Sequence, residues 1–199
     1  MTNGEAGQRR LPGYVIGSII ATGFGTGFIA GNSGGLPDPW PQILRIGAAL
    51  CAAALIIATF RTRSASTAAP ASGPAPAVEP VLARQAMGRG YWIVVAIEAI
   101  ALFGGLFVIN GVLHRSEVAV AWVALIVGLH FYGLGAVWHA PMYHWLATAM
   151  TALAVAGFVT YAAGGSAAAV SAVAGVGSGV CLYGAVLWGL LRARRGLAV

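Results

Sequence analysis

The chain has 199 residues, of which 59% are hydrophobic and 8% are charged, and its mean hydropathy is +0.83. Soluble domains carry about 25% charged residues, so this composition excludes an ordinary soluble domain and predicts an integral membrane protein. The net charge of +6 comes from arginines at the ends of apolar runs, where orientation signals lie, and does not indicate nucleic-acid binding. We therefore expect the lipid bilayer, and no nucleic acid, as a partner.

Six segments are long and apolar enough to cross a bilayer, which takes about 20 residues of helix. The sequence thus predicts an all-α, polytopic membrane protein with six transmembrane helices. The expected spans are Leu11–Gly31, Pro41–Phe60, Gly90–Val112, Val118–Val137, Tyr143–Ala163 and Ser166–Leu191.

The arginines predict how these spans are oriented. They cluster before the first span, between spans two and three, and after the last span, and six spans put these three regions on one side. The opposite loops hold only Arg115, with Arg45 just inside the second span. The positive-inside rule then predicts that both termini are cytoplasmic. The arginine-rich, lysine-free composition is typical of a high-GC bacterium, so we expect a multi-pass protein of a bacterial plasma membrane.

A long connection separates the second span from the third. Residues 61–89 are rich in Ala, Pro and Ser, a composition that cannot bury enough apolar surface to fold. We interpret this segment as a disordered cytoplasmic linker. It divides the chain into residues 1–60, a tail with a two-helix transmembrane hairpin, and residues 90–199, a block of four transmembrane helices.

Small residues recur at four-residue spacing in the first and last spans. Such stripes let helix backbones approach closely, and we expect them to pack within one bundle. The alternative is a homo-oligomer formed through these glycine-rich helices. The stripes are Gly23, Gly27 and Gly31, and Ser171, Gly175 and Gly179.

The most informative residue is Glu98, which lies in the otherwise apolar segment Gly90–Val112. An ionisable side chain at the centre of a transmembrane helix costs about 2.5–3.5 kcal/mol on insertion scales. Packing alone gives no reason to bear that cost, so an intramembrane carboxylate indicates a functional site by default. We predict that Glu98 is a catalytic acid–base group.

His130 is the predicted partner of Glu98. The two residues lie at equal distances along the chain from His114, in the short loop that joins spans three and four. Antiparallel helices joined in this way bring such positions to equal depth, here in the cytoplasmic half of the membrane. The pair would be a general acid–base or proton-coupling site; the alternative is a structural hydrogen bond that fixes helix register. Helix rotation, and thus whether the side chains face each other, stays open.

Aromatic and polar residues of the same spans are candidates for a substrate pocket. Rings at headgroup level are ordinary interfacial anchors, and that alternative stays open. With no CxxCH motif and no metal-ligand spacing of cysteines, we expect neither a cofactor nor a bound metal. The candidate substrate-binding residues are Trp92, Asn110, Tyr132, Trp138, His139, Tyr143 and His144.

Four motifs between Tyr91 and Gly157 form a pattern: Glu98 in IEAIALF, Asn110 after an apolar run, ALIVGLHF (Ala124–Phe131) and PMYHW (Pro141–Trp145). With them the segment resembles a family of small, uncharacterised six-span bacterial membrane proteins. The resemblance covers about one third of the chain, and VGLHF is its most specific piece. It implies a family-level role for Glu98 and His130 and brings no known activity.

Three functions fit this pattern. The first is a membrane enzyme acting on a hydrophobic small molecule, such as an isoprenoid or terpene cyclase, in which Glu98 is the general acid and aromatic faces stabilise cations. The second is a small proton-coupled transporter or permease, since intramembrane carboxylates are common proton relays. The third is an accessory structural subunit in which Glu98 is hydrogen-bonded to a neighbouring helix. An enclosed pocket at Glu98 would favour the enzyme, and a surface without a cavity would favour the accessory subunit.

Overall fold

The computed structural model describes residues 13–68 and 88–195, without the side chains of residues 13, 14 and 63–68. The predicted N-terminal tail and most of the predicted linker lie outside the described residues. Within them, six helices are long and apolar enough to cross a membrane, which confirms the predicted fold class. They are Val15–Asn32, Trp40–Thr62, Arg89–Val112, Ser116–Trp138, Pro141–Ala162 and Ala167–Arg194.

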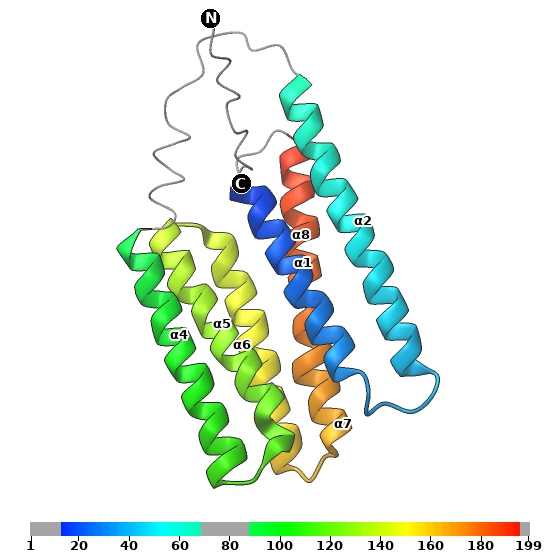
Figure 1. Ribbon diagram of the computed structural model, residues 1–199, viewed down its shortest axis with the longest axis vertical. Helices are drawn as coiled ribbons and strands as arrows, with labels where there is room; N and C mark the ends of the chain where they lie inside the picture. Colours follow the sequence, from blue (N-terminus) through cyan, green and yellow to red (C-terminus); the bar gives the residue numbers. More distant parts are fainter. Residues whose placement is uncertain (1–12, 69–87, 196–199) are drawn as a thin grey trace, which may run out of the picture.

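The elements are all helical, and short turns join them except between α2 and α4 (Figure 1). Two spans contain a π-helical stretch, and one begins with a 3₁₀ turn. The bounds are α1 Gly13–Asn32, α2 Trp40–Ala68, α4 Arg89–Phe107 continued by π-helix η1 Val108–Val112, 3₁₀ turn η2 Ser116–Val118, α5 Ala119–Trp138, α6 Pro141–Ala162, and the last span as α7 Ala167–Val170, π-helix η3 Ser171–Val176 and α8 Gly177–Arg194.

Local chemistry explains several of these boundaries. His139 ends α5 in the left-handed conformation, with φ of 53°, and Pro141 follows in the first turn of α6, where its missing N–H is not needed. The side chain of Ser166 caps α7 by accepting a hydrogen bond from the amide of Ala169 at 3.2 Å. Helix α2 continues to Ala68, so the first residues of the segment that we expected to be disordered are helical.

The helices form one bundle with two recognisable halves. Figure 1 shows α4, α5 and α6 side by side in one half and α1, α2 and α8 in the other. Helix α8 packs on both α1 and α6 and thereby joins the halves. The predicted two-helix hairpin therefore does not stand apart from the last four spans.

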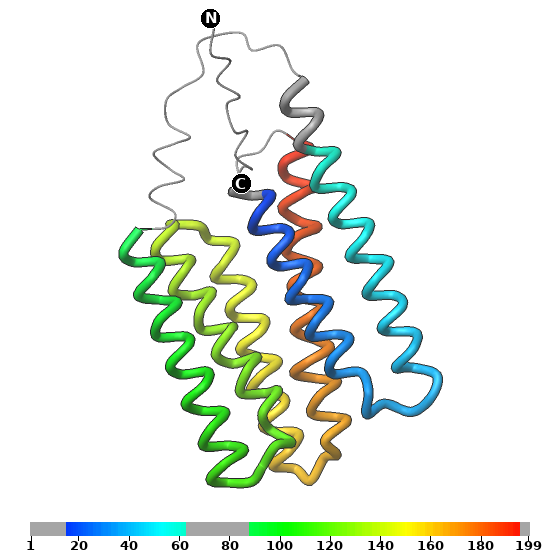
Figure 2. The backbone as a smooth tube through the Cα atoms, viewed as in Figure 1, coloured from blue at the N-terminus to red at the C-terminus, as the bar shows by residue number. Residues whose placement is uncertain are grey.

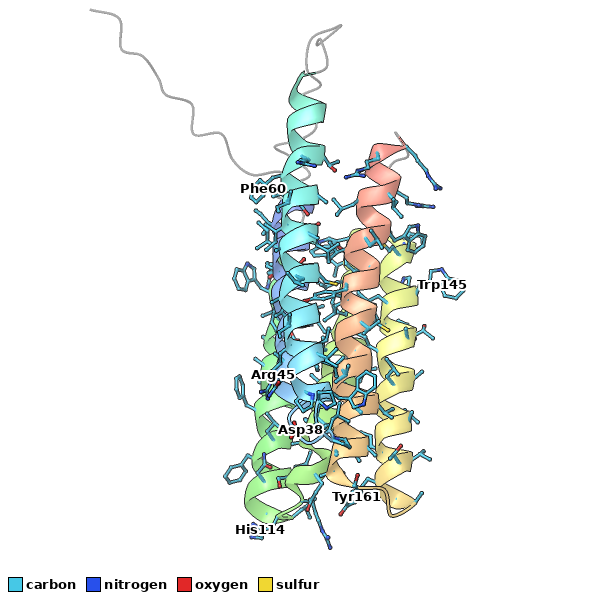
Figure 3. All side chains as sticks on the ribbon, turned by 90° about the vertical axis from the view of Figure 1, so that its right-hand side faces the viewer. Asp38, Arg45, Phe60, His114, Trp145 and Tyr161 are labelled. Atoms are coloured by element: carbon cyan, nitrogen blue, oxygen red, sulfur yellow. The ribbon has the colours of Figure 1, made fainter. Side chains whose placement is uncertain are left out.

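The bundle has two distinct ends. The start of α1, the ends of α2 and α8, and the start of α4 lie together at what we call the linker end, which is the upper end in Figure 2. The opposite end, which we call the loop end, carries the connections after α1, after η1 and after α6. Figure 3 shows Asp38, His114 and Tyr161 toward this end.

The core lies where α1, α5, α6 and the last span meet, and small side chains dominate it. Ala121, Ala124, Met150 and Ala154 are fully buried there, with Leu182 almost so. Small residues allow helix backbones to approach closely, which is the main source of packing energy between helices in a bilayer.

The predicted glycine stripes are only partly correct. In the last span, Gly175 lies under Asn32, and Gly179 lies against Ile29 and the carbonyl of Gly25. The first-span stripe of Gly23, Gly27 and Gly31 faces open space, so its predicted packing inside the bundle is wrong. Helix α1 instead approaches α8 through Gly25, which lies two residues from Gly23 and from Gly27 and so on a different face of the helix. The homo-oligomer stays a prediction.

Tyr183 links three helices of the second half. Its hydroxyl lies 2.6 Å from the Oγ1 of Thr26 on α1 and donates to the carbonyl of Ala48 on α2 at 2.9 Å. Unpaired polar groups are costly in an apolar medium, so these contacts fix the mutual rotation of α1, α2 and α8.

Candidate functional site

The candidate site is the contact between Glu98 on α4 and His130 on α5. The Nδ1 atom of His130 lies 2.9 Å from the Oε2 atom of Glu98, and the side chains are 12% and 23% exposed, respectively. Glu98 lies nine residues into α4, about 14 Å along the helix axis and hence well inside a hydrocarbon core about 30 Å thick. The equal depth predicted from the hairpin is realised, and the two side chains face each other.

Three glycines determine how α4 and α5 are rotated against each other. Each offers space that the opposite helix fills. Gly90 lies under Val137, Gly133 lies under Val94, and Gly105 lies under the indole of Trp122. The Nε1 of Trp122 also donates to the carbonyl of Ala101 at 3.2 Å. This row of close contacts turns the Glu98 face of α4 toward α5.

The two groups lie at salt-bridge distance without forming an aligned hydrogen bond. Nδ1 of His130 has no partner with regular hydrogen-bond geometry among the described residues, although the carboxylate oxygen is within contact distance. A small rotation of either side chain would align the N–H with the oxygen and allow the two groups to exchange a proton. Glu98 is partly exposed, so its side chain is not sealed inside the bundle.

A row of aromatic rings leads from the linker end to this pair. Tyr91 stacks on Trp138 with centroids 6.1 Å apart, and Trp138 meets Tyr143 edge-on at 5.2 Å. Tyr143 stacks on Phe131 at 6.1 Å, and Phe131 meets the His130 ring at 5.7 Å. We call Tyr91, Trp138, Tyr143 and Phe131 the aromatic row.

Two members of this row, Tyr91 and Phe131, were not among the predicted substrate-binding residues. A signal for Tyr91 exists in the sequence. The antiparallel register that pairs Glu98 with His130 also brings Tyr91 level with Trp138. Phe131 follows His130 directly, and its side chain turns toward α6, where Tyr143 lies.

The other predicted substrate-binding residues lie apart from the pair. Trp92 is 59% exposed and touches Tyr91 edge-on, and His139 is an exposed cap residue. Tyr132 and His144 meet each other on α5 and α6, away from the Glu98 contact, and the Tyr132 hydroxyl lies 2.6 Å from the Oγ1 of Thr148.

Asn110 lies farthest from the pair. It belongs to the π-helix η1 at the loop end, where its carbonyl is 3.1 Å from Nδ1 of His114. Twelve residues of helix separate it from Glu98, about 18 Å along the axis. Asn110 and Glu98 therefore lie at clearly different depths of the bundle.

The structure shows a cavity elsewhere in the bundle. A hollow of about 440 Å³ opens at the loop end between α1, the start of α5 and the start of the last span. Its lining includes none of the predicted site residues.

Comparisons with protein-family models, with curated proteins and with solved structures found no match to this chain.

Proposed function

We propose that this multi-pass membrane protein is an acid–base enzyme for a hydrophobic, unsaturated substrate that reaches the Glu98–His130 pair laterally from the bilayer. The observation that carries the proposal is the 2.9 Å contact of a carboxyl and an imidazole group at membrane depth, with Glu98 23% exposed. Holding an ionisable pair there opposes insertion, which is the reason such residues generally mark function. The aromatic row beside His130 adds π faces that can stabilise a cation.

The reaction class that suits these groups is isomerisation or cyclisation of an isoprenoid chain. A protonated Glu98 would transfer its proton to one carbon of a C=C bond, forming a C–H bond and a carbocation. The cation would rearrange or close a ring, and a neighbouring C–H would return its proton to the Glu98 carboxylate. The sequence of steps is balanced and needs no oxidant or co-reactant, and His130 would orient the carboxyl group.

Deuterium incorporation tests this proposal directly. The purified parent protein in bilayer discs, in heavy water, is incubated with geranylgeraniol, and the recovered lipid is examined by mass spectrometry. We expect solvent deuterium in the lipid with the parent, at least a hundredfold less with Glu98→Gln, and partial activity with Glu98→Asp. Asp38→Asn, which removes an exposed carboxylate at the loop end, is the matched control and should behave as the parent.

A structural role for the pair is the second candidate, because α4 has no buried residue and packs chiefly on α5. The hollow described above does not include Glu98 or His130, so it is not the enclosed pocket that the enzyme predicts. Here the ion pair would hold α4 in place. Equal labelling by the parent and by Glu98→Gln, or none by either, would contradict the enzyme. If Glu98→Gln then also lowers thermal stability, the structural role is supported. Proton uptake by vesicles that depends on Glu98 would instead support the transporter.

The cytoplasmic position of both termini is part of the same proposal. The second span ends at Thr62, next to Arg61, and the last span ends at Arg194, with Arg192 and Arg195 beside it. Both ends belong to the linker end, and arginine-rich ends stay on the cytoplasmic side. Reporter fusions that are active only in the cytoplasm should be active at both the N-terminus and the C-terminus. Activity of a periplasmic reporter at either position would contradict the orientation.

A further inference from the structure

A second site, independent of the proposed acid–base function, lies in the hollow at the loop end. The hollow of about 440 Å³ is open to the surroundings and is bordered by three different elements: the end of α1, the turn η2 with the start of α5, and the last span around the junction of α7 and η3. None of the residues of the Glu98–His130 pair or of the aromatic row contributes to it. Any ligand held here is therefore separate from the proposed substrate.

The lining combines an apolar floor with a polar rim that is rich in hydrogen-bond acceptors. Phe28, Val120 and Val123 supply apolar surface, and Asn32 and Glu117 supply acceptor oxygens. The side-chain amide of Asn32 is already occupied, since Nδ2 donates to the carbonyl of Phe28 at 2.8 Å, so its Oδ1 remains as an acceptor. Ser116 and Ser171 add hydroxyl groups, which can donate or accept.

Glu117, an exposed residue, gives the hollow a negative charge that meets no counter-charge among the described residues. Within residues 13–68 and 88–195, the ion pair between Glu98 and His130 is the only one observed, and Glu117 makes no hydrogen bond through its side chain. Arg115, two residues earlier, forms no ion pair with it. A carboxylate at the rim of an apolar hollow favours a cation that brings its own apolar body.

The backbone around the hollow departs from regular helix in the same place. Ser171, which lines the hollow, is the first residue of the π-helix η3. Gly175, in the same π-helix, provides the space in which the side chain of Asn32 lies. Short π-helical stretches inside α-helices occur frequently at functional sites, and this one helps to shape the hollow.

We propose that this hollow binds a protonated amine carried on an apolar chain. The ammonium group would donate to the carboxylate of Glu117 and to the Oδ1 of Asn32, and the chain would lie on Phe28, Val120 and Val123. A phospholipid with an amine headgroup and a free alkylamine share this chemistry. A fatty acid does not, because its carboxylate would be repelled by Glu117.

Binding of n-octylamine to the full-length protein in neutral detergent tests the site. Octanol and octanoate, with the same chain length, separate the contribution of the charge. The affinity of each ligand is obtained from the rise in thermal midpoint with ligand concentration. We expect octylamine to bind at least tenfold more tightly than octanol or octanoate. Glu117→Gln should weaken octylamine binding at least tenfold, whereas Asp38→Asn, which removes an exposed carboxylate outside the hollow, should not.

Two further variants and a lipid comparison complete the test. Val123→Trp fills the hollow and should abolish octylamine binding in protein whose circular dichroism is that of the parent; if it does not fold, Ala119→Leu replaces it. In bilayer discs, competition by phosphatidylethanolamine but not by phosphatidylglycerol identifies a lipid headgroup as the occupant, and no competition identifies a free amine. Equal binding of octanol and octylamine, or unchanged octylamine binding by Glu117→Gln, would overturn the proposal.

Discussion

Helices α4 and α5 are both apolar enough to span a membrane, yet they occupy opposite environments. No residue of α4 is buried, whereas seven residues of α5 are. Helix α4 packs chiefly on α5, while α5 also packs on α6 and on the last span. Large apolar residues such as Ile97, Ile100 and Phe103 of α4 are more than half exposed, which in a bilayer means that they face lipid.

The difference shows what selects the central helix of a membrane bundle. In water the more apolar helix would be buried. Lipid is as apolar as the protein interior, so in a bilayer hydropathy does not decide which helix is central and which faces lipid. Helix α5 presents small residues, among them Ala121, Ala124 and Gly128, to neighbours on several sides. Helix α4 makes close contact along one stripe only, the stripe that holds Glu98.

The largest expected effect comes from filling the close contact between α5 and α6. A Cβ at Gly128 would lie 2.8 Å from the Oγ1 and 3.0 Å from the backbone nitrogen of Thr151, and backbone cannot move aside cheaply. Gly128→Leu should therefore destabilise the protein by about 3 kcal/mol, measured by denaturant unfolding in micelles. Gly104→Leu, whose Cβ would meet open space on α4, is the matched control and should change stability by less than about 0.5 kcal/mol. If Gly128→Leu and Gly104→Leu change the free energy of unfolding equally, the proposed difference between a tightly packed α5 and a lipid-facing α4 is wrong.

A smaller effect is expected one residue farther along α4. A Cβ at Gly105 would enter the space of the Trp122 indole, a side chain that can move. Gly105→Leu should displace the indole from the carbonyl of Ala101 and destabilise the protein by about 1–2 kcal/mol. Tryptophan emission should shift at the same time. If Gly105→Leu is as harmless as Gly104→Leu, α4 is not held on α5 by this face.

The smallest expected effect is the coupling between Glu98 and His130. Polar contacts between transmembrane helices, even when hydrogen-bonded, contribute about 0.6 kcal/mol on average, because the separated helices find other partners. A double-mutant cycle with Glu98→Ala and His130→Ala should give a coupling energy of that size, measured as free energies of unfolding. A coupling near the maximum for such pairs, about 1.7 kcal/mol, would favour the structural role. A small coupling with lost deuterium incorporation would favour catalysis.

The sequence by itself determined the elements of this protein. The six apolar runs predicted the six spans to within a few residues, because length and hydropathy alone decide whether a helix can cross a bilayer. The short loop around His114 also predicted that Glu98 and His130 lie at equal depth, since the rise per residue of a helix is fixed.

Only the tertiary structure decided which faces meet. A helix that is apolar all round carries no periodic signal of its buried side, so the sequence could not orient Glu98 toward His130. The choice of Gly25 over the neighbouring glycine stripe of α1 was equally hidden, because both are small residues in an apolar run. Shape-complementary contacts between helices determine both the orientation of Glu98 and the use of Gly25. These contacts are Trp122 over Gly105, Val94 over Gly133, and Tyr183 over Gly25. Such contacts exist only once the helices are assembled.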